Sequence, residues 1–434
     1  MRLRTLPAAA ALLAAGLAIA IAVAANGAAP RPAASQPGAA GAAAASPPRS
    51  IDAVRAHLAQ VPGDWPAWSS LGALELERGR ATGDPAAYAA AQQAYGTSLR
   101  LQREGNDAAL AGAAALSAAR HEFATAQRQA QQALAINPES PEALAALTDA
   151  LTELGRYGPA LATARRLDAV RPGLASFARL SYQAELRGQI PQAIDLMGRA
   201  AGEATTPAQV AFTRTHEGLL ALGRHDLAAA QDAYRAGVAV APTDTALIFL
   251  GARIAWATGD PELAVRRYAD LVARRPSPVY AGAQAEALHA TGDRREEAAA
   301  LDLVRASQRL AVTAGVAPEG ADVLFEADHG DPGRAIVLGA RVWKRSPSVG
   351  AADAYGWALH VAGRDRQALT YADQALSLGG KPALVLAHRG MIRAALGMRA
   401  GARADLTAAL HEDPTFSALL APRAQALLDR LERS

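Results

Sequence analysis

"PEALAALTDALTELGRYGPALATARRLDAVRP", residues 141–172, contains one complete structural unit of this chain. Leucines recur in its first half at three- and four-residue spacing, which places them on one face of a helix. After Gly155 the apolar face continues through a second amphipathic segment, which ends at Pro172. Glycine permits a tight turn, and proline cannot continue a helix. The stretch therefore predicts two antiparallel helices joined by a short turn.

The same glycine and proline pattern recurs along the chain. Glycines at intervals of 33 to 38 residues separate amphipathic segments, and a proline follows most of the second segments. One hairpin of this size cannot cover its own apolar face, so neighbouring hairpins must stack on both sides of it. An all-α solenoid with a concave and a convex surface is therefore expected. The recurring glycines are Gly155, Gly188, Gly223, Gly259, Gly292, Gly330, Gly363 and Gly397.

In the spacing of its apolar and small residues the unit resembles the tetratricopeptide repeat, a 34-residue helical hairpin. Repeats at 349–382 and 383–416 match that pattern in the same phase. The resemblance implies a right-handed superhelical solenoid of about ten helix-turn-helix repeats that binds partners in its concave groove. With Gly155 taken as position 15 of the repeat, the matching residues in the quoted unit are Leu144, Leu147, Leu151, Ala160 and Pro172.

The beginning of the chain has the features of an export signal. Two arginines precede an apolar run over residues 6–25, which ends near the small-x-small sequence Ala22-Val23-Ala24. Residues 1–25 are therefore expected to be a signal peptide, or a retained membrane anchor, because the run is also long enough to span a bilayer. Residues 26–50, rich in Ala, Pro, Gly and Ser, predict a flexible linker. The solenoid is expected to cover 51–417 and a capping helix 418–434.

Composition excludes several classes of site. The chain has no cysteine, so disulfides, thiolate metal sites and a Cys nucleophile are excluded. Its 44 basic and 41 acidic residues form no basic stripe with interleaved aromatic residues, so nucleic acid is not an expected partner. Membrane contact is expected only through the N-terminal segment. No cofactor is expected, and the protein is expected to be a monomer in the periplasm, the cell envelope or the extracellular medium.

Groove residues follow from the resemblance, which places positions 2, 5, 9 and 12 of each first helix on the concave surface. A lysine-asparagine clamp for a peptide carboxylate cannot be formed, because neither lysine falls on those positions. Aromatic residues in a polar rim suit a protein or peptide ligand, although each of them could instead pack between helices. The predicted groove residues are Asp149, Tyr182, Glu217, Arg253, Trp256, Glu286, Trp357 and Met391.

The stretch "EADHGDPGRA", residues 326–335, allows two interpretations. As a helix junction, it has Asp331 as the N-cap of a helix whose first residue is Pro332. As a metal site, it has Asp322, Glu326 and His329 at i, i+4 and i+7 on one helix face. The first interpretation is favoured, because Gly-Asp-Pro also occurs at 83–85 and 259–261, where a turn is expected.

The expected function is that of an exported, non-catalytic scaffold that binds a protein or peptide in its groove. No nucleophile elbow, P-loop or H-E-x-x-H motif occurs, and the repeats leave no room for a catalytic domain. Two alternatives remain. One is a small-ligand or metal-binding accessory protein of the cell envelope. The other is a repeat-built enzyme, which would need His and carboxylates clustered deep in the groove with perturbed pKa values.

Overall fold

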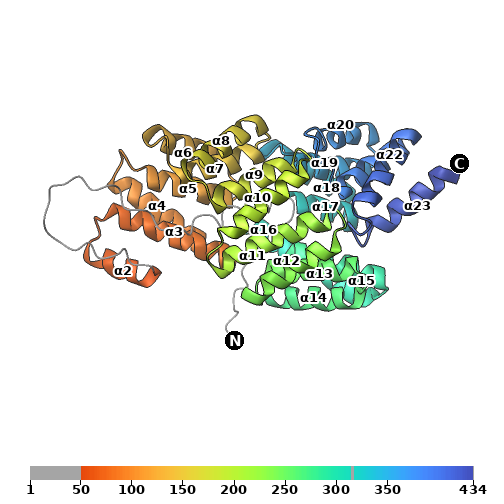
Figure 1. Cartoon of the computed structure of the whole chain (residues 1–434), viewed down its shortest axis with the longest axis horizontal. Helices are drawn as coiled ribbons and strands as arrows, with labels where there is room; N and C mark the ends of the chain where they lie inside the picture. Colours follow the sequence, from red (N-terminus) through yellow and green to blue (C-terminus); the bar gives the residue numbers. More distant parts are fainter. Residues whose placement is uncertain (1–49, 314–316, 434) are drawn as a thin grey trace.

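The computed structural model describes residues 50–313 and 317–433, which form 22 α-helices and no strand. The fold is therefore all-α, as predicted (Figure 1). The predicted signal or anchor and the linker up to residue 49 lie outside the described residues. None of the described helices is both long enough and apolar enough to cross a membrane.

Ten consecutive helix pairs make up the array, in agreement with the predicted number. The short helix α2 (Ile51–Gln60) precedes them and α23 (Leu420–Arg433) follows them. The pairs are α3 (Trp65–Thr82) with α4 (Pro85–Leu101), α5 (Asp107–Ala119) with α6 (Phe123–Ile136), α7 (Pro141–Glu153) with α8 (Tyr157–Val170), α9 (Leu174–Glu185) with α10 (Ile190–Gly202), α11 (Pro207–Leu222) with α12 (Leu227–Val240), α13 (Thr245–Ala257) with α14 (Pro261–Arg274), α15 (Pro278–Thr291) with α16 (Arg294–Thr313), α17 (Gly320–His329) with α18 (Pro332–Arg345), α19 (Val349–Val361) with α20 (Asp365–Ala375), and α21 (Ala383–Ala395) with α22 (Arg399–Glu412).

Most turns within a pair depend on one residue with left-handed backbone. Gly155 has φ 68° in the turn between α7 and α8, a conformation that glycine adopts at little cost. Two pairs use a histidine at the equivalent point, His121 with φ 59° and His225 with φ 53°. The second of these corrects the predicted register, because Gly223 has φ −63° and only ends α11. In that repeat, each position therefore lies two residues later than predicted.

Aspartate side chains cap the first turn of several of the second helices. Asp331 accepts a hydrogen bond from the backbone N–H of Arg334 at 2.7 Å, and Pro332 is the first residue of α18. The predicted N-cap is thus confirmed. Asp260 caps α14 in the same way, accepting from the N–H of Leu263 at 2.9 Å.

Small residues lie where neighbouring helices, within a pair or between pairs, approach most closely. Ala160 on α8 and Ala368 on α20 are completely buried. Gly112 on α5 faces the ring of Tyr95, and a Cβ at this glycine would lie 2.3 Å from a ring carbon. The core therefore consists of thin layers shared by neighbouring pairs.

Later repeats close back onto earlier ones. The hydroxyl of Ser346 donates to the carbonyl of Glu153 at 2.8 Å, although 193 residues separate them. The N–H of Val349 donates to the Tyr157 hydroxyl at 2.6 Å, and that of Gly380 to the carbonyl of Leu186 at 3.1 Å. The loops before α19 and α21 thus pack against the turns of the third and fourth pairs. We call this the ring contact.

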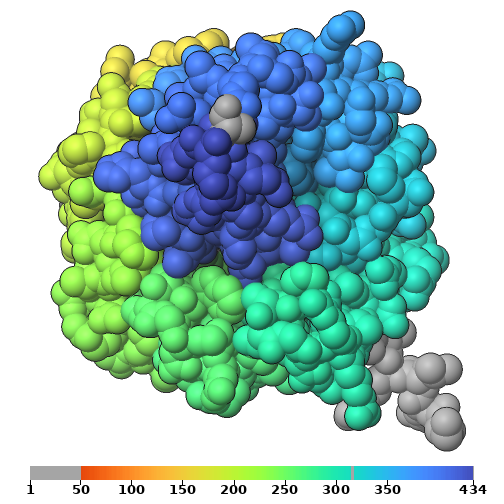
Figure 2. All heavy atoms as spheres, turned by 90° about the vertical axis from the view of Figure 1, so that its right-hand side faces the viewer, coloured from red at the N-terminus to blue at the C-terminus, as the bar shows by residue number. Residues whose placement is uncertain are grey.

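The C-terminal end of the chain lies over the middle of the ring. Figure 2 shows α22 and α23 at the centre of one face, with earlier repeats around them. The loop between these helices reaches the fifth, sixth and seventh pairs. In that loop, Asp413 lies 4.0 Å from His225 and 3.8 Å from Arg253, and Ser417 donates to Glu286 at 3.1 Å.

Candidate functional site

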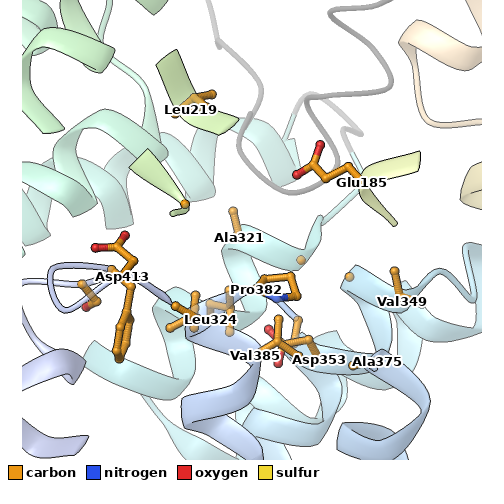
Figure 3. Close-up of a pocket in the computed structure, with 18 of the residues that line it drawn as sticks. Glu185, Leu219, Ala321, Leu324, Val349, Asp353, Ala375, Pro382, Val385 and Asp413 are labelled. Carbon is orange, nitrogen blue, oxygen red and sulfur yellow. The ribbon is translucent and has the colours of Figure 1, made fainter. Parts of the chain in front are cut away.

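The ring surrounds a partly open cavity of about 930 Å³. Its lining comes from most of the helices between α6 and α23 and from several loops, including the loops that make the ring contact. Apolar side chains form much of the wall, among them Leu219, Leu324 and Val385 (Figure 3). A cavity of this size lies within the range typical of ligand pockets.

Charged residues on the cavity wall are mostly acidic. Eight Asp or Glu residues line it, against four Arg or Lys residues. Figure 3 shows Glu185 at the upper right, Asp413 at the left and Asp353 at the bottom of the pocket. An acidic lining repels phosphate groups, so this cavity does not suit a nucleic acid. The acidic residues are Glu153, Glu185, Glu286, Glu319, Asp328, Asp353, Glu412 and Asp413.

Four residues of neighbouring pairs form one side of the cavity, which we call the acidic wall: Glu153, Tyr157, Tyr182 and Glu185. Burial raises the pKa of Glu153 to about 8, against the opposing effect of the nearby His121. Burial alone raises the pKa of Glu185 to about 7. No described residue forms a hydrogen bond or ion pair with the Glu185 side chain.

A buried ion pair lies beside the acidic wall. Nε2 of His121 is 2.5 Å from Oε1 of Glu319, which joins the second pair to the start of α17. Burial lowers the pKa of His121, but the carboxylates of Glu319 and Glu153 outweigh it and leave that pKa above its ordinary value. The His121 turn therefore has a structural partner.

Two further histidines line the cavity. His216 is 6% exposed, and burial lowers its pKa to about 3, so its ring is neutral. Its Nδ1 has no hydrogen-bond partner among the described residues. Nδ1 of His388 is 2.9 Å from Asp353, and its ring stacks on Trp357 at a centroid distance of 4.1 Å.

The structure brings together half of the predicted groove residues. Tyr182, Arg253, Trp256 and Glu286 all line the cavity. Arg253 and Glu286 face the loop before α23, where they contact Asp413 and Ser417.

The other four predicted groove residues lie outside the cavity lining. Asp149 is buried in a bidentate ion pair with Arg179, at 2.9 and 2.7 Å. Trp357 is 4% exposed and donates from Nε1 to Asp328 at 2.8 Å, so it is a core residue. Met391 is buried in the same apolar cluster, beneath the C-terminal helices.

Glu217 misses the cavity because of the register change in its repeat. With His225 as the turn residue, position 9 of α11 is Leu219, and Leu219 lines the cavity. Glu217 instead forms an ion pair with Arg214 at 2.7 Å.

The candidate metal ligands face three different partners. Asp322 accepts from the N–H of Glu319 at 2.9 Å and from Gln308 at 3.1 Å. Glu326 lies 3.3 Å from Arg334, and His329 lies 3.9 Å from Glu286. Within 50–313 and 317–433, no group of three or more His, Asp or Glu side chains is placed to hold a metal ion.

Sequence reasoning at position 9 missed Glu153, Glu185, His216, Asp353 and His388. Position 12 carried a signal in four of the repeats, where Thr152, Glu185, Leu222 and Trp256 occupy it and line the cavity. For the remaining cavity residues, the resemblance gave no indication that later repeats would face earlier ones.

No protein-family model matches the chain, and no curated protein sequence matches it. Among solved structures it is similar to Pseudomonas aeruginosa PilF, with 18% identity and a TM-score of 0.37, over 54% of this chain and 99% of that one. It is also similar to Cut9–Hcn1 of APC/C, with 13% identity and a TM-score of 0.40, over 88% of this chain and 81% of that one. It is similar as well to a human IFIT1 dimer with PPP-AAAA, with 17% identity and a TM-score of 0.47, over 76% of this chain and 77% of that one. The ten helix pairs and their turns make this chain an all-α solenoid of helix-turn-helix repeats, the architecture that the resemblance to the tetratricopeptide repeat implies.

Proposed function

We propose that this chain is an exported, non-catalytic scaffold of the cell envelope that binds an extended segment of a protein partner in the cavity within the ring. The observation that carries the proposal is the cavity itself, about 930 Å³ in volume and lined by apolar side chains and several polar groups. Pockets that bind ligands combine these two kinds of surface, because apolar contacts give affinity and polar groups fix orientation. Export is proposed from the N-terminal sequence alone.

We also propose that the protein is not a catalyst, although one observation favours the enzyme alternative. Histidines and carboxylates with perturbed pKa values do cluster at the cavity. A nucleophilic mechanism needs a hydroxyl or similar group hydrogen-bonded to its base. Nε2 of His388 and Nδ1 of His216 have no such partner in the described part of the chain. Binding therefore accounts for the site better than nucleophilic catalysis.

Site-specific photocrosslinking in cells tests the binding site. The full-length protein would carry benzoylphenylalanine at Leu219, inside the cavity, or at Val337, which is 49% exposed on α18. The proposal expects a protein adduct from position 219 and none of the same mass from position 337. Adducts only from position 337, or none from either, would contradict it.

The small-ligand alternative has its own outcome. A ligand that co-purifies with the protein and is identified by native mass spectrometry would favour it, provided that position 219 gives no protein adduct. Export is tested by the accessibility of the protein to added protease in intact, permeabilised and lysed cells. A protein that is digested only after lysis would contradict export.

A further inference from the structure

The acidic wall contains a carboxyl group without a counter-charge. Glu185 lies at the end of α9 and points from one side into the cavity (Figure 3). The nearby guanidinium of Arg187 does not pair with it, because Arg187 donates to the carbonyls of Gln183 at 2.6 Å and Tyr157 at 3.0 Å. Lys381 also lines the cavity but is exposed to solvent.

Glu185 is partly buried, and a carboxylate partly shielded from water is unfavourable in its ionised form unless a cation or hydrogen-bond donors accompany it. The raised pKa of Glu185 has burial as its cause, which agrees with the missing partner. A ligand that brings its own positive charge would therefore gain a charge-assisted hydrogen bond here.

Aromatic rings complete the surroundings of this carboxyl. Tyr182 precedes Glu185 by three residues, which places both on the same helix face. Tyr157 lies on the neighbouring helix, and its ring also lines the cavity. Rings next to carboxylates suit an ammonium or guanidinium group, since the ring face attracts cations. The Tyr182 hydroxyl has no hydrogen-bond partner among the described residues and is a free donor or acceptor.

A second polar group of the cavity also lacks a partner. His216, on α11, is nine-tenths buried, and its neutral ring leaves Nδ1 without a hydrogen bond. Such an atom can bind a peptide N–H or carbonyl, depending on its tautomer.

We propose that the acidic wall binds a lysine or arginine side chain, so that the partner segment held in the cavity is basic. This inference rests on the proposed function and specifies its ligand. Around the whole cavity, carboxylates outnumber Arg and Lys, and this excess also favours a positively charged ligand.

Peptide selection tests the inference with the full-length protein. The immobilised protein would select from a random hexapeptide pool with blocked ends, and selected peptides would be sequenced by mass spectrometry. Wild type is expected to enrich arginine or lysine at least tenfold. In Glu185→Gln this enrichment should disappear. The control Glu203→Gln, which removes the same charge from the exposed end of α10, should retain it. Unchanged melting temperatures would exclude unfolding.

A small cation separates this inference from the proposed function. Agmatine, titrated by calorimetry, should bind wild type and Glu203→Gln but bind Glu185→Gln at least tenfold more weakly. Agmatine binding without any peptide enrichment would keep the cation site and overturn peptide binding. Enrichment of peptides without basic residues would keep peptide binding and overturn the cation site. If neither agmatine binding nor peptide enrichment is observed, the cation site and peptide binding are both overturned.

Discussion

At the scale of single residues, burial of ionisable groups gives the fold a dependence on pH. Glu153 has a folded-state pKa of about 8, which lies above its ordinary value of 4.5, so the folded protein binds a proton that the unfolded chain releases. Its contribution to stability is therefore fully present below pH 4.5 and is lost as pH rises through about 8. Raised pKa values at His121 and Glu185 act in the same direction.

Glu153→Gln isolates this effect, because glutamine resembles the protonated side chain. Between pH 5 and 8 the free energy of unfolding of the variant should rise relative to wild type by about 1.4 kcal/mol per pH unit at most. Urea unfolding at several pH values, followed by circular dichroism, measures the difference. A difference that does not change with pH would show that Glu153 is already ionised in the fold.

Individual residues were also where the sequence was least informative. The spacing of Trp357 could not distinguish a groove side chain from a core one, since both occupy position 9 of the repeat. Its burial depends on Asp328 and His388, which belong to neighbouring repeats. Glu217 was misplaced because a histidine with positive φ is uncommon, and Gly223 was the expected turn residue.

At the scale of helices, prediction from the sequence was successful because each pair is determined locally. Apolar spacing fixed the helices, and Gly, Asp and Pro fixed their junctions, so the number of pairs and the Asp331 cap could be predicted. The ring contact could not, because it joins loops about 190 residues apart, and each of its hydrogen bonds uses at least one backbone group, which every residue has.

Close packing of paired helices can be tested at the two fully buried alanines. We expect Ala160→Leu and Ala368→Leu each to lower the free energy of unfolding by about 1 to 3 kcal/mol, because a larger side chain separates the helices. Chemical unfolding measures the change. Ala86→Leu, at an exposed position of α4, is the control and should have little effect. Unchanged stability in both core variants would show that these contacts adapt to a larger side chain.

The Asp331 cap gives a test that also bears on the metal hypothesis. Asp331→Ala should reduce stability by about 1 kcal/mol, because a backbone N–H of α18 loses its acceptor. The loss should be the same with added Zn²⁺ and with a chelator. His329→Ala serves as the comparison. A rise in wild-type melting temperature with Zn²⁺ that His329→Ala abolishes would instead support an ion at Asp322, Glu326 and His329.

At the scale of the whole molecule, the ring contact determines whether a cavity exists. Gly188 has φ 70°, and a Cβ there would lie 2.6 Å from the carbonyl oxygen of Gly379 across the contact. Gly363 has φ 74° but open space around it. These two glycines share the same backbone conformation and differ in the contact alone.

Gly363→Ala should reduce stability by about 1 to 2 kcal/mol, the cost of left-handed backbone for alanine. Gly188→Ala should carry that same cost and in addition separate the two turns of the superhelix, which would enlarge the radius of gyration measured by X-ray scattering. Equal radii for the two variants would show that the ring contact yields without opening.

The distance along the chain between the two sides of the ring contact has a consequence for how the cavity is made. Ribosomes synthesise the N-terminal repeats first, and each helix pair needs only its neighbours to fold. The repeats that carry Glu153 and Tyr157 can therefore fold before Ser346 and Val349 reach them. Until then the early repeats form an open arc, and the cavity appears only in the last step. A truncated chain that lacks the last repeats therefore cannot form the cavity, even when every helix that it contains is correctly folded.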